Sequence, residues 1–166
     1  VLCAFAAGGS LGDRPPARAL ERVSEHIPAN KRPDAALVVS PFFDEDSHAA
    51  LDALSSLMRQ RGGRRIRFGA EGRRLDDGRY RLHLPSWTGA ATRGRSWVGL
   101  FRVSEEEDER EPRPLHAKML CVGRDGDYRV TMIGSSNFTR AGLALGGSAA
   151  NLEANLVYSA TKAAAV

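Results

Sequence analysis

One histidine and one lysine stand two positions apart in the stretch HAKMLCV, residues 116–122. Imidazole can act as a nucleophile or carry a proton near neutral pH, so His116 is a candidate catalytic residue. Lys118 adds a compact positive charge, and it is one of only three lysines in a chain that otherwise uses arginine. A histidine and a lysine at this spacing can act together on an anionic group such as a phosphate.

The alternation of side chains in this stretch is typical of a strand. Successive side chains of a strand point to opposite faces, so His116 and Lys118 would share one face. The sequence GRDGD, residues 123–127, then supplies an Asp-Gly turn, and YRVTMIG at residues 128–134 is a second apolar run. Together these signals predict an antiparallel hairpin.

The predicted hairpin returns to a short polar segment, GSSN, at residues 134–137. An antiparallel return places this segment beside the candidate histidine and lysine. The Asn137 amide can donate hydrogen bonds, while Ser135 and Ser136 can add hydroxyl groups. We therefore expect a cradle that holds the non-bridging oxygens of a phosphate and stabilises charge developing on it. This chemistry requires neither a metal nor a cofactor.

Several patterns predict the elements that must position these residues. Residues 35–39 form a continuous apolar run typical of a buried strand. Ser47 is a suitable N-cap for a helix that ends at the glycines of residues 62–63, and a short strand follows at residues 64–70. A further helix is predicted at residues 16–27. This order predicts a layered α/β fold with a mixed, largely parallel central sheet flanked by helices.

An H-x-K motif followed downstream by G-S-x-N resembles the phospholipase D superfamily, the HKD phosphodiesterases. The match here is His116-Ala117-Lys118, then GSSN with FTRAGL directly after it, and NLEANLVY at residues 151–158. The stretch LVVSPFFD at residues 37–44 resembles the strand and loop that open one half of such proteins. The resemblance is strong over residues 114–158 and extends over 35–158.

The resemblance implies a single phospholipase D-like domain over residues 1–166 that carries one HKD half. In such proteins one histidine attacks phosphorus to form a phosphohistidine, and a second protonates the leaving oxygen and then activates water. That mechanism needs two H-x-K motifs, and this chain has one. We expect the second from a dimer mate or from an upstream half, and the start at Val1 favours a truncated C-terminal half. The resemblance leaves open whether His116 is the nucleophile or the general acid.

One position departs from the family pattern. The family places an aspartate, thought to be mainly structural, five residues after the lysine, and that position here is Gly123. Asp125 and Asp127 lie just beyond it, and either is a candidate replacement. Glu153 matches a downstream acidic residue that orients the histidine in relatives. Such a partner would fix the tautomer and stabilise imidazolium.

The distribution of charge suggests the substrate. The formal net charge is +4, and residues 59–102 contain twelve arginines opposed by three acidic side chains. Such a stretch is either a solvated arginine-rich surface or a surface that attracts a polyanion, such as nucleic acid or an anionic lipid surface. The segment GSSNFTRAGL resembles the nuclease-like branches of the superfamily, and this resemblance implies a phosphodiester in DNA or RNA rather than in lipid. Trp87 and Trp97 could stack on unpaired bases, although anchoring the core or a loop is the more common use of tryptophan. The alternative function is a non-catalytic nucleic-acid-binding module or a structural half of a phospholipase D-like protein.

The two cysteines, Cys3 and Cys121, stand far apart in apolar runs. They are typical of buried thiols in a reducing compartment, which predicts a cytoplasmic protein. No apolar run approaches the length of about 20 residues that a transmembrane helix needs.

Overall fold

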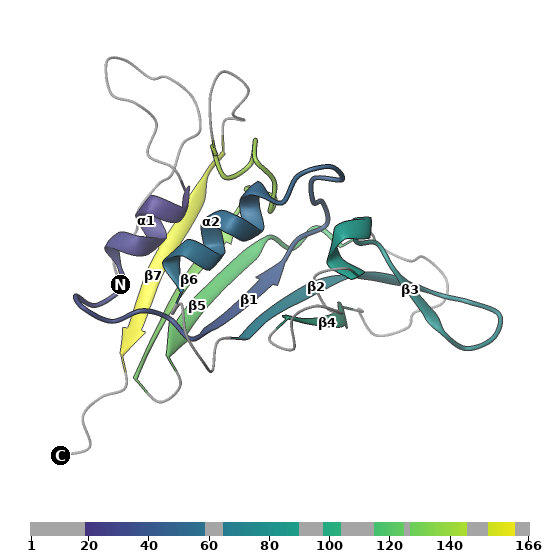
Figure 1. The fold of residues 1–166 in the computed structure, drawn as a ribbon, viewed down its shortest axis with the longest axis horizontal. Helices are drawn as coiled ribbons and strands as arrows, with labels where there is room; N and C mark the ends of the chain where they lie inside the picture. The colour runs from purple at the N-terminus through teal and green to yellow at the C-terminus, as the bar shows by residue number, and fades with distance from the viewer. Residues whose placement is uncertain are drawn as a thin grey trace.

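The computed structural model describes residues 19–58, 65–89, 98–103, 115–124, 127–145 and 153–161. Its described strands form one seven-stranded sheet in the order β3-β2-β1-β5-β6-β7, with β4 paired to β2 as well (Figure 1). The strands are β1 (Ala35–Val39), β2 (Arg65–Arg74), β3 (Tyr80–Leu82), β4 (Val98–Val103), β5 (Met119–Arg124), β6 (Tyr128–Gly134) and β7 (Asn155–Thr161). The labelled helices are α1 (Ala19–Glu25) and α2 (Ala49–Leu57), and residues 86–89 form a further helical turn.

The sheet is mixed, as predicted, but its parallel part is smaller than predicted. Strand β2 is parallel to β1 and β4, whereas the pairs β1–β5, β5–β6, β6–β7 and β2–β3 are antiparallel. The layered α/β fold is therefore confirmed, and the expectation of a largely parallel sheet is wrong. Short turns join the antiparallel pairs β2–β3 and β5–β6, whereas β1–β5 and β6–β7 are antiparallel neighbours that are distant in the chain. A parallel pair such as β1–β2 needs a crossover, here through α2.

The chain leaves β1 at Ser40-Pro41, because proline has no N–H to donate to a sheet ladder. Helix α2 then begins at Ala49 with His48 as its N-cap, one residue later than a Ser47 cap implies. Ser47 still contributes, since its Oγ accepts a hydrogen bond from the Ala49 N–H at 3.2 Å. The predicted helix start is thus right to within a residue.

The core lies between the sheet and the two helices, which cover the same face of the sheet (Figure 1). Alternate residues of the central strands, among them Leu120 and Val122 of β5, point into this layer and are buried. Against them pack Val23 of α1 and Leu51 and Leu54 of α2, each at most 1% exposed. The packing of this single layer fixes the register of the strands, and with it the positions of the strand ends.

The face of the sheet away from the described helices carries a shallow hollow of about 840 Å³. Its floor includes Leu37, Met119, Cys121, Thr131 and Tyr158, which alternate with the core residues on the same strands. Cys121 is a half-buried free thiol, and Cys3 lies outside the described residues. None of the helices in the described part of the chain is long and apolar enough to cross a membrane.

Candidate active site

Four strand ends meet at one end of the sheet. Val39, the last residue of β1, pairs with Met119, the first residue of β5. Met119 in turn pairs with Ile133 near the end of β6, and Gly134 pairs with Asn155 at the start of β7. The segments flanking these ends are therefore neighbours in space. They carry all of the sequence-predicted site residues, namely His116, Lys118, Ser135, Ser136, Asn137 and Glu153.

The histidine and lysine precede β5, which begins at Met119 and not at residue 116 as the alternation predicts. Pairing stops there because the partner strand β1 ends at Val39. The Leu115 N–H donates to the Glu71 carboxylate at 3.3 Å, and the Lys118 carbonyl accepts from the Gly134 N–H at 3.3 Å. Both ends of this four-residue segment are thus tied to the sheet.

Within this segment the imidazole of His116 is exposed, and Lys118 is half-buried. The Lys118 ammonium donates a hydrogen bond to the His116 carbonyl oxygen at 3.0 Å. This contact draws the positive charge back toward the histidine. The ammonium has two further protons, so it can still donate to an anion at the same place.

Ser135 joins the end of β6 to the segment before β7. Its N–H donates to the Ala154 carbonyl at 3.0 Å, and its Oγ accepts from the Ala154 N–H at 2.8 Å. Glu153, the next residue back along the chain, is half-buried. The exposed Ser135 hydroxyl also donates to the Ala154 carbonyl at 3.4 Å. The serine therefore positions the predicted acidic residue at this end of the sheet.

Ser136 is turned inward and is 6% exposed. Its Oγ accepts from Asn155 Nδ2 at 2.7 Å, and its N–H donates to Asn155 Oδ1 at 3.2 Å. This pair gives Ser136 a structural partner in place of the predicted phosphate contact. Sequence reasoning missed Asn155, since only the register of β6 and β7 brings a residue nineteen positions away to the serine.

Asn137 lies at the start of a tight turn that holds its backbone. The Asn137 carbonyl accepts from the Thr139 N–H at 2.9 Å, and a Cβ on Gly142 would lie 2.5 Å from the same carbonyl oxygen. Its side-chain oxygen is buried and has no hydrogen-bond partner among the described residues. An unpaired buried amide oxygen costs free energy, so this carboxamide is suited to gain a partner when a ligand or a neighbouring side chain supplies one.

The loop after β1 is bound to the Asn137 turn across 98 positions of sequence. Ser40 is fully buried, and its Oγ accepts from the Phe138 N–H at 3.0 Å. The Asp44 carboxylate accepts from the Arg140 N–H at 2.6 Å. Phe43 packs with its ring centroid 6.1 Å from that of Phe138. These contacts make the loop and the turn one unit, which the motif alone did not reveal.

Trp87 is part of this packing. It is 7% exposed, its ring centroid lies 6.0 Å from that of Phe68, and its Nε1 donates to the Asp44 carbonyl at 2.8 Å. The tryptophan thus anchors the loop and the core, and its ring does not offer a free face to a base. Trp97 lies outside the described residues.

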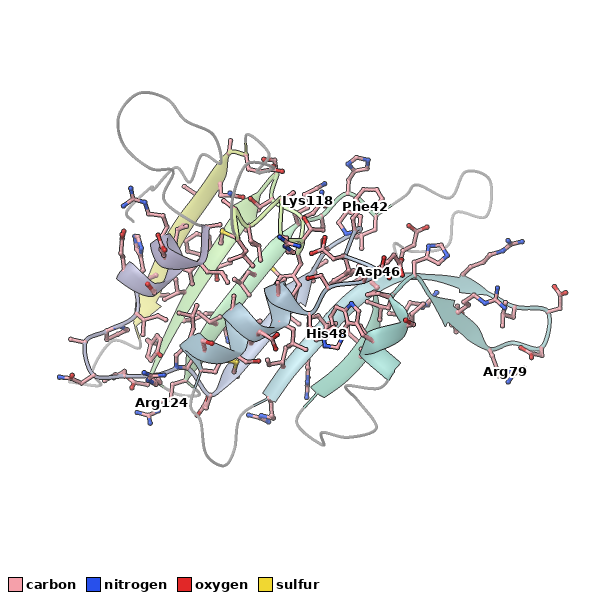
Figure 2. All side chains as sticks on the ribbon, turned by 45° about the horizontal axis from the view of Figure 1, so that its top comes forward. Phe42, Asp46, His48, Arg79, Lys118 and Arg124 are labelled. Atoms are coloured by element: carbon pink, nitrogen blue, oxygen red, sulfur yellow. The ribbon has the colours of Figure 1, made fainter. Side chains whose placement is uncertain are left out.

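The opposite end of the sheet holds the β5–β6 turn (Figure 2, where Arg124 and Lys118 mark the two ends). Asp127 forms an ion pair with Lys31 there at 2.7 Å, and Asp125 lies outside the described residues. A Cβ at Gly123 would lie 2.5 Å from the Tyr128 carbonyl oxygen. The position of the family aspartate is therefore closed to a larger side chain in this chain and distant from Lys118.

The described part of the arginine-rich stretch includes a hairpin of β2 and β3 that projects from the rest of the sheet (Figure 1). Arg79, at its tip, lies well away from Lys118 (Figure 2). It is paired with Asp77, and its guanidinium lowers the pKa of that carboxyl by hydrogen bonding. Arg102 stacks 4.0 Å above the Tyr80 ring. Part of this positive charge is thus engaged within the protein.

Among the described residues, no group of three or more histidine, cysteine and acidic side chains could hold a metal ion. The residues of the predicted cradle, which carry an imidazole, an ammonium, a carboxamide and hydroxyl groups, lie on the segments that flank the four strand ends.

The architecture is that of a phospholipase D-like fold. In all, 22 chains of known structure match it, among them NucT from Helicobacter pylori, with a TM-score of 0.51 and 12% sequence identity. That match covers 84% of this chain and 76% of NucT. No protein-family model and no curated protein sequence matches the chain. The likeness is one of fold, and the roles of the site residues are inferred below.

Proposed function

We propose that the chain is one half of a phospholipase D-like phosphodiesterase, with His116, Lys118, Asn137 and Glu153 as its catalytic residues. The observation that carries this proposal is the meeting of four strand ends. It gathers the segments that bear these residues at one end of the sheet. The likeness to NucT, a nuclease of the phospholipase D superfamily, supports the same class of reaction.

In the proposed reaction an imidazole nitrogen of one histidine attacks phosphorus, so that a P–N bond forms as the P–O bond to the leaving group breaks. A second histidine gives its proton to the leaving oxygen. That histidine then takes a proton from water, and the water oxygen attacks phosphorus and breaks the P–N bond. Lys118 and Asn137 would stabilise the equatorial oxygens, with Ser135 as a further donor. Glu153 would orient His116.

The second H-x-K motif must come from another half, either a second copy of this chain or an upstream domain. The proposed substrate is a phosphodiester in nucleic acid. The net charge of +4 and the exposed arginines Arg65, Arg67 and Arg73 on β2 support an anionic polymer as the substrate.

The test is hydrolysis of DNA and of a chromogenic phosphodiester by the chain, and by its longer parent if one exists, with EDTA present. Removing the nucleophile or proton carrier in His116→Ala should lower kcat at least ~100-fold on both substrates. The matched control is His26→Ala, because His26 lies just beyond α1 and its Nδ1 contacts only the Arg22 carbonyl, at 2.9 Å. Equal rates for the wild type and His116→Ala would refute the proposal.

A non-catalytic nucleic-acid-binding module is the second candidate. The observation in its favour is Gly123, which stands where the family has an aspartate and has no room for one. Binding to DNA that weakens with salt, survives His116→Ala and is accompanied by no turnover in any assembly would establish this function instead. A lipid-cleaving protein would act on phosphatidyl vesicles and leave DNA intact.

A further inference from the structure

Phe42 is the most exposed large hydrophobic side chain of the described residues, with 62% of its surface accessible. It follows the end of β1 by three residues, and Val39 of β1 pairs with Met119, the neighbour of Lys118. Figure 2 accordingly shows Phe42 and Lys118 at the same end of the sheet. An aromatic ring is therefore presented to solvent beside the candidate active site.

The backbone around Phe42 is held on both sides. Ser40 Oγ donates to the Phe42 carbonyl at 2.7 Å while it accepts from the Phe138 N–H. Two residues beyond Phe42, Asp44 accepts hydrogen bonds from Arg140 and Trp87. The exposed ring is thus carried by a loop with fixed ends, so little ordering is needed before it can bind.

The neighbouring residue explains why Phe42 remains outside. Phe43 fills the apolar space below the loop, with its ring centroid 6.0 Å from Phe68 and 6.1 Å from Phe138, both in edge-on contact. The place that an aromatic ring could take in the core is therefore occupied. Phe42 therefore contributes little to folding by burial, and its ring is accessible to a ligand.

We propose that Phe42 is a stacking platform for an unpaired nucleobase next to the phosphate bound at His116 and Lys118. Every base has an aromatic face, and stacking on a protein ring is the usual way in which single strands are held. In a duplex both faces of each base are already covered by its neighbours. We therefore expect the Phe42 ring to bind single-stranded nucleic acid in preference to a duplex. The position of the phosphate in this proposal rests on the proposed function.

The charges around the ring favour a base over the other apolar ligands. Glu45 and Asp46 are exposed and lie three and four residues beyond Phe42. An anionic lipid surface that buried the ring would meet these carboxylates, whereas a nucleobase is neutral. The phosphate would lie on the other side of the ring, toward the Lys118 ammonium. In this proposal the Phe42 ring binds the base, and the Lys118 ammonium binds its phosphate.

Binding measured in the His116→Ala background tests the stacking separately from the chemistry. A single-stranded oligonucleotide with 2-aminopurine reports stacking as quenching of its fluorescence. Phe42→Ala should weaken binding roughly 5- to 150-fold and remove the quenching, and Phe42→Trp should retain both. An oligonucleotide of the same length with abasic residues should bind with equal affinity to the protein that retains Phe42 and to the Phe42→Ala variant. Leu100→Ala, which trims a 38% exposed side chain on β4, is the matched control and should change nothing.

Equal affinity of the phenylalanine and alanine forms for the 2-aminopurine strand would overturn the proposal. So would an equal loss on the abasic strand, because the ring would then not be in contact with a base. If Phe42→Ala instead lowers the solution mass, the ring is part of a contact between two copies. If it abolishes binding to phosphatidylglycerol vesicles alone, the ligand is lipid. Loss of hydrolysis by His116→Ala is a separate readout and concerns the proposed function only.

Discussion

Replacing Ser40 by alanine removes one hydroxyl that two segments of the candidate site share. The Phe138 N–H is buried and would lose its acceptor, and the Phe42 carbonyl would lose a donor. A buried donor left without a partner costs about 1–3 kcal/mol. We take about 2 kcal/mol as the expected loss in the free energy of unfolding. For a chain of this size that corresponds to a fall in Tm of about 4–8 °C.

The measurement is urea denaturation followed by circular dichroism at neutral pH, where the midpoint should fall without a change in m-value. Ser56→Ala is the control, because Ser56 is exposed on α2 and its Oγ donates only to the Asp52 carbonyl in its own helix. That variant should stay within about 0.5 kcal/mol of the wild type. If Ser40→Ala is equally neutral, the hydroxyl does not hold the loop and the turn together.

Two further variants test the packing at each end of the hairpin. Gly134→Ala would place a Cβ 2.6 Å from the Asn155 Cα and closer still to the Ala154 carbonyl, so it should cost about 3 kcal/mol or more by the same denaturation assay. Gly99→Ala, whose Cβ would have only an ordinary contact at 3.6 Å, should be tolerated, and equal effects would contradict the reasoning. Burial raises the pKa of Tyr128 above its ordinary value of 10.0, and its hydroxyl has no partner among the described residues. As the pH rises, Tyr128 therefore loses its hydroxyl proton in the unfolded chain at a lower pH than in the folded protein. The free energy of unfolding consequently falls as the pH rises above 10. Tyr128→Phe should be about as stable at pH 8 and lose less stability at pH 10.5; parallel losses would exclude Tyr128 as the cause.

Local sequence signals predicted the elements that depend on neighbours along the chain. The apolar run of residues 35–39, followed by Ser40-Pro41, gave β1 with its correct bounds. The alternation around Leu120 and Val122 and the Asp-Gly turn gave the β5–β6 hairpin, whose register brings Gly134 back to Lys118. These features follow from periodicity and turn chemistry, which can be read without knowledge of the remaining chain.

Features that depend on distant partners were not predictable in the same way. The strand predicted from His116 begins only at Met119, because its length is set by where β1 ends. The Ser136 side chain points inward because its hydroxyl oxygen accepts a hydrogen bond from the Asn155 amide, and no local sequence pattern predicts that pair. The balance of parallel and antiparallel pairs likewise depends on which strands become neighbours, and a strand–helix–strand order fixes only one of those choices.

The bond between Ser40 and Phe138 joins residues 98 positions apart. During synthesis the loop after β1 therefore leaves the ribosome long before the turn that completes it. A nascent chain cannot complete this loop until residues 138–140 have emerged, since Phe138 and Arg140 donate the hydrogen bonds that Ser40 and Asp44 accept. The proposed phosphate cradle therefore depends on contacts between residues distant in the chain, which form later in folding than local contacts do.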